Sequence, residues 1–159
     1  CMMRIPVALT MRERVCFLKV LYSFFLRDDK LTSIEEEVLS MLQKAFNIEG
    51  DQQKEFQVRF FSNVESMADE VNKIADVNAR VYLLAIIKEL YLIEKKSVRN
   101  FPAREREIFE STYSGLLQQV KIDQADIDPF VEISDPDNSQ SSTWLGLPSI
   151  KGIKNLLGF

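Results

Sequence analysis

The sequence has 159 residues, of which 46% are hydrophobic and 28% are charged, and its formal net charge is −4 at pH 7. These totals are typical of one globular domain and exclude a disordered chain or a disulfide scaffold. The acidic balance, without a dense basic cluster, argues against nucleic-acid binding. The sequence contains no histidine, which excludes Ser-His-Asp and Cys-His catalysis and imidazole metal sites.

Apolar residues recur at spacings of three and four through the first 120 residues, and this is the period of an α-helix. The pattern predicts an all-α fold, a compact bundle of about six helices. We expect helices at about 10–26, 32–47, 51–61, 63–74, 76–95 and 102–120. The first and fifth of these are apolar on nearly every side, so we expect them to be central in the bundle.

Several residues predict local features of these helices. Thr10 with Glu13 matches a capping box, and Asp76 is suited to cap the fifth helix. Pro102 fits the first position of the sixth helix, where its missing N–H costs nothing. Gly115, inside that helix, predicts the close approach of a neighbouring element.

The two cysteines do not suggest a disulfide framework. Cys16 lies in an apolar segment, so we expect an inert core thiol. Cys1 is compatible with a processed precursor or with the start of a lipoprotein, and the sequence leaves its origin open. No apolar run approaches the roughly 20 residues that a membrane span needs, so we expect a cytoplasmic protein that meets membranes only at their surface.

The composition changes after the sixth helix, and we divide the chain into three parts. Residues 1–121 form the helical domain, 122–142 an acidic turn and flexible linker, and 143–159 an amphipathic tail. The linker carries acids without a basic residue among them: Asp123, Asp126, Asp128, Glu132, Asp135 and Asp137.

The tail is the segment that most favours an interaction. Its large apolar residues, which we predict to bind a partner, are Trp144, Leu145, Leu147, Ile150, Ile153, Leu156, Leu157 and Phe159. Burying each is worth roughly 1.5–3 kcal/mol, so we expect the tail to dock. Three destinations compete: its own bundle, a groove on another protein or a second copy, and a membrane surface.

The sequence also suggests an internal repeat. Residues 18–46 and 83–117 each contain an apolar predicted helix, a charged loop and a glutamate-rich predicted helix. This predicts two related helix-loop-helix halves. The segment Leu26-Arg27-Asp28-Asp29-Lys30-Leu31-Thr32-Ser33-Ile34-Glu35 resembles the Ala-Asp-Gly-x-Ile-(Ser/Thr)-x-x-Glu segment of the tellurite-resistance TerB-like family. The resemblance in layout covers about residues 9–120 and implies an all-helical fold with two related halves.

The resemblance also implies a metal site. Asp28 and Glu35 would be the family's acids in the first half, and Glu94 and Glu105 their counterparts in the second. Two features favour a purely structural role instead. Asp29 stands in place of the family's glycine, and the adjacent lysines at 95–96 would oppose a hard cation, which prefers several oxygen ligands.

Taken together, these patterns predict a non-enzymatic protein-interaction or adaptor module of TerB-like character. Its partner would be another protein or a second copy of the chain, with peripheral membrane contact through the tail. The alternative is a metal-binding stress-response domain that uses the loop carboxylates, with a divalent metal as its only cofactor. An enzyme acting through carboxylates is a third, more distant class.

Overall fold

The computed structural model describes residues 9–25, 33–48, 64–97 and 100–131. Their elements are α1 (Met11–Phe25), α2 (Ser33–Ala45), α4 (Val64–Asn72), α5 (Val77–Ser97), α6 (Ala103–Val120), α7 (Gln124–Ile127) and the 3-10 helix η2 (Asp128–Phe130). No β-strand occurs within these ranges, and the all-α prediction is confirmed. The helix predicted at 51–61 lies outside the described residues.

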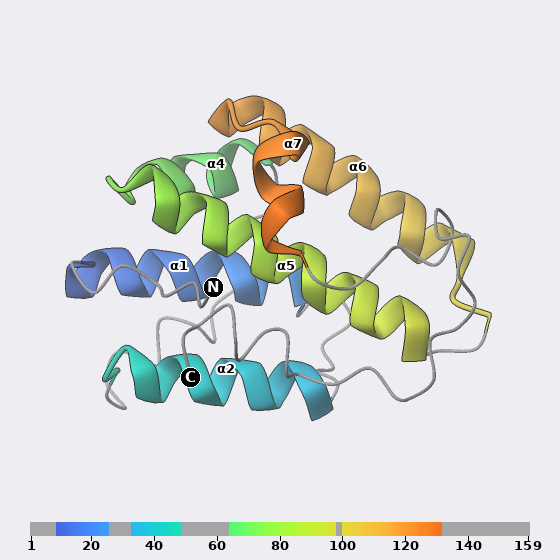
Figure 1. The fold of residues 1–159 in the computed structure, drawn as a ribbon, viewed down its shortest axis with the longest axis horizontal. Coiled ribbons are helices and arrows are strands. Elements are labelled where there is room, and N and C mark those ends of the chain that lie inside the picture. Colours follow the sequence, from blue (N-terminus) through green and yellow to red (C-terminus); the bar gives the residue numbers. More distant parts are fainter. Residues whose placement is uncertain (1–8, 26–32, 49–63, 98–99, 132–159) are drawn as a thin grey trace.

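The helices form a bundle around α1 and α5, as the sequence predicts. α4 packs against both α1 and α6, and α1 contacts α5 and α2. α7 and η2 pack against α5, and α7 crosses it in the view of Figure 1. The helices of the two predicted pairs are α1 with α2 and α5 with α6, and the relation between the two pairs stays a prediction.

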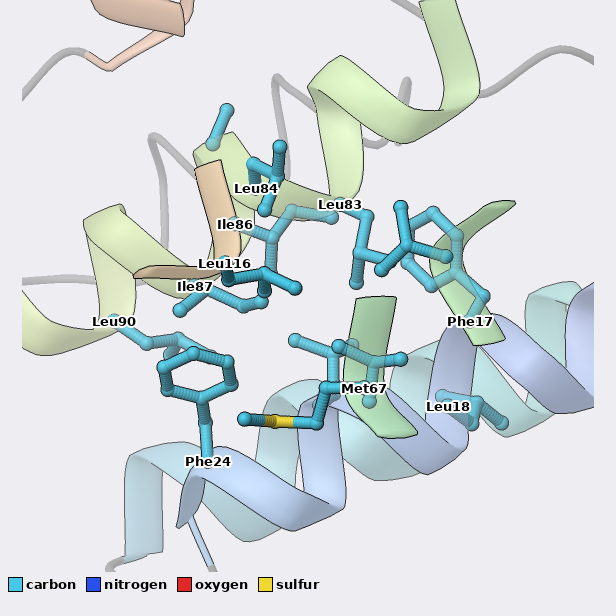
Figure 2. Packing of buried hydrophobic residues seen from close by; sticks show 14 of the residues in the cluster. Phe17, Leu18, Phe24, Met67, Leu83, Leu84, Ile86, Ile87, Leu90 and Leu116 are labelled. Atoms are coloured by element: carbon cyan, nitrogen blue, oxygen red, sulfur yellow. The ribbon is translucent and has the colours of Figure 1, made fainter. Parts of the chain in front are cut away.

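The core is built from the apolar stripes of these helices. In Figure 2, Phe24 of α1, Met67 of α4 and Leu90 of α5 gather in one cluster, which Leu116 of α6 completes. Every residue from Leu83 to Ile87 is buried. Because consecutive helical residues point in different directions, α5 is surrounded on all sides.

Local capping defines the helix ends near the start of α1. The predicted capping box is confirmed: the Thr10 amide donates to Glu13 Oε1 (2.9 Å), and the Glu13 amide donates to Thr10 Oγ1 (3.1 Å). The Asp76 carboxylate accepts from the amides of Asn78 (2.8 Å) and Ala79 (3.4 Å) at the start of α5. These bonds satisfy amides that a helix terminus leaves without intrahelical acceptors.

Three charged side chains form hydrogen bonds that connect different helices at the end of the bundle where α1 begins. The Ala75 amide donates to Glu13 Oε2 (2.8 Å), which links α1 to the connection between α4 and α5. Arg14 Nη1 donates to the Phe46 carbonyl (2.8 Å) just beyond α2, and Arg80 Nη2 donates to the Asn72 carbonyl (3.1 Å) at the end of α4.

Two details differ from the sequence-based expectation or refine it. Pro102 is the N-cap of α6, one residue before the predicted position, with an extended backbone (φ −60°, ψ 130°). Gly115 does face a neighbour, since a Cβ there would lie 3.5 Å from Val64 of α4. That distance is an ordinary van der Waals contact, so α4 and α6 leave room for a methyl group.

Candidate functional site

The carboxylates proposed as metal ligands belong to segments that meet at one end of the bundle. Glu35 is in the first turn of α2, Glu94 is near the end of α5 and Glu105 is in the first turn of α6, and Figure 1 shows these helix ends on the same side. Glu35 is only 4% exposed, Glu94 is half-buried and Glu105 is exposed. Asp28 lies outside the described residues.

The described residues do not form a metal cluster by themselves. Across residues 9–25, 33–48, 64–97 and 100–131, no three His, Cys, Asp or Glu side chains are placed to hold one ion. The neighbourhood also carries buried positive charge, since Lys95 is 8% exposed. Its Nζ lies 5.6 Å from the centroid of the Tyr91 ring, within range of a cation–π contact.

An aromatic cluster joins α5 to α6 and α1. Tyr91 stacks on Phe109 with centroids 3.8 Å apart and an interplanar angle of 6°, and Phe109 stacks on Tyr113 at 5.4 Å. Phe24 meets Phe109 edge-on at 5.6 Å, and Phe101 meets Tyr91 at 5.8 Å. Helical periodicity alone does not predict that these residues form one cluster.

The aromatic cluster is polar at one edge, where the Tyr113 phenol is buried. The Tyr113 hydroxyl donates to the Leu84 carbonyl oxygen (3.0 Å). Burial, and secondarily the negative charge of Asp128, raises the pKa of Tyr113 far above its ordinary value. Lys88 Nζ lies 5.6 Å from the Tyr113 ring centroid. The neutral phenol therefore cross-links α5 and α6 and contributes no titrating group near neutral pH.

Cys16 is the second place where titratable groups meet. The thiol is buried, as predicted, and burial together with a hydrogen bond to Glu70 raises its pKa to about 12. Burial would raise the pKa of Glu70, but hydrogen bonds from Cys16 and Lys73 and the charge of Lys19 outweigh it and lower that pKa. Lys73 Nζ lies 2.8 Å from Glu70 Oε1. The thiol stays protonated and is a poor nucleophile.

Two large apolar side chains are exposed among the described residues. Val77, at the start of α5, is 58% exposed, and Ile108, on α6, is 42% exposed. They belong to different helices and each is a single side chain, which is normal for a protein surface.

The residues predicted to bind a partner lie outside the described residues. They all fall within 143–159, whereas the described chain ends at Val131 after η2. None of the described helices is long and apolar enough to cross a membrane.

Comparison with protein-family models, curated proteins and solved structures gives no match to this chain.

Proposed function

We propose that this protein is a non-enzymatic interaction or adaptor module in which residues 143–159 bind a protein partner. One observation carries the proposal: a segment of 17 residues with eight large apolar side chains follows a folded helical bundle. Ile150, Ile153 and Leu156 share one helical face, which is the pattern of a helix that binds in a groove. The chemistry of the bundle is consistent with this, because its buried thiol and phenol are held protonated.

A helix made by this tail would be weak in isolation. Gly146, Gly152 and Gly158 each cost about 1 kcal/mol relative to alanine in a helix. Such a segment folds when it meets a surface, and the apolar area that it buries offsets its ordering. A protein groove is favoured over a lipid surface because Lys151 and Lys154 are the only basic residues of the tail, few for electrostatic attraction to anionic lipids.

The test compares two doubly substituted full-length chains. Ile153→Ser/Leu156→Ser removes apolar side chains, whereas Lys154→Ser/Asn155→Ser introduces the same residues on the polar face. We expect affinity capture from native lysate to recover a specific partner with the wild type and the second variant, but not with the first. Equal recovery by all three would contradict the proposal, and binding of the wild type only to anionic vesicles would replace the partner by a membrane.

A second candidate, a metal-binding stress-response domain of TerB-like character, is favoured by one feature of the topology. The start of α2 and the end of α5 lie at the same end of the bundle (Figure 1), so Glu35 and Glu94 are both on that side. Carboxylates are the ligands that hard divalent cations prefer. Titration with calcium, magnesium or zinc should then raise the melting temperature, and Asp28→Ala should abolish that increase. No increase with any of the three would exclude this candidate.

A further inference from the structure

We draw no further inference here: the strongest candidate, the side-chain cluster of Cys16, Glu70 and Lys73 at the contact of α1 and α4, is a buried thiol beside a surface ion pair, and nothing in the described part of the chain points to a ligand that it would bind.

Discussion

Gly115 lies inside α6, where its missing side chain faces Val64 of α4. A glycine inside a helix is less favourable than alanine by roughly 0.5–1 kcal/mol, because the unfolded chain loses more freedom on folding. The 3.5 Å from a Cβ to Val64 is an ordinary contact. We therefore predict that Gly115→Ala stabilises the protein by about 0.5–1 kcal/mol in urea denaturation. Destabilisation would show that α4 and α6 approach more closely than this distance implies.

Glu13 gives a prediction about pH. Hydrogen bonds from the amides of Thr10 and Ala75 lower its pKa in the folded protein. A carboxyl whose pKa is lower when folded stabilises the fold above its unfolded pKa, and this stabilisation is lost as pH falls through the folded value. We predict that Glu13→Gln costs about 0.5–1 kcal/mol at neutral pH, a modest value because the site is largely solvated.

The same comparison should shrink in acid. Urea denaturation of the wild type and Glu13→Gln over a series of falling pH should show the two stabilities converging as the pH passes below the lowered pKa of Glu13, where the wild-type carboxyl is protonated. A constant difference throughout the series would mean that the amides bind the side chain without regard to its charge.

At the scale of the element, α6 ends in a strained residue. Lys121 has a left-handed backbone (φ 58°, ψ 43°), and the Ile122 amide donates to the Leu117 carbonyl (3.2 Å). Glycine adopts this conformation without the cost that Cβ imposes. We predict that Lys121→Gly stabilises the protein by about 0.5–1 kcal/mol. As control, Gln119→Gly, on the exposed side of the helix, should cost about 1 kcal/mol. Two changes of the same sign would contradict the prediction.

Helix existence and capping could be predicted because both depend on neighbours in sequence. Thr10 and Glu13 are three residues apart, and a helix start brings such residues together whatever surrounds them. The bond from the Ala75 amide to Glu13 spans 62 residues, and the bond from Arg14 to Phe46 spans 32. Contacts of this kind depend on how helices cross, which periodicity does not determine.

The candidate site shows the same limit. Glu35 and Glu105 both lie in the first turn of a helix, yet Glu35 is buried and Glu105 is exposed. Their burial depends on which element packs over that turn, and the spacing of residues within a helix does not determine this packing. The stack of Tyr91 on Phe109 likewise joins α5 to α6. Periodicity can place each ring on an apolar face of its helix, but it cannot pair the two rings.

At the scale of the whole molecule, docking of the tail on its own bundle, one of the three destinations that the sequence leaves open, would make the tail and the bundle unfold together. Such docking would bury Ile153 and Leu156, and each buried side chain is worth roughly 1.5–3 kcal/mol. We predict that Ile153→Ser/Leu156→Ser lowers the free energy of unfolding by about 2 kcal/mol or more. It should also lower the urea m-value, because less surface is buried in the folded state.

The matched variant Lys154→Ser/Asn155→Ser places serine on the opposite face of the tail, so its stability should stay within about 0.5 kcal/mol of the wild type. Far-UV circular dichroism follows the helices, and Trp144 emission follows the tail. In the wild type and the matched variant the two urea transitions should coincide, as expected for one cooperative unit. If Trp144 became solvated at lower urea than the helices unfold, the tail would be a separate segment that is held weakly or not at all by the bundle, and a partner would bind it with little competition.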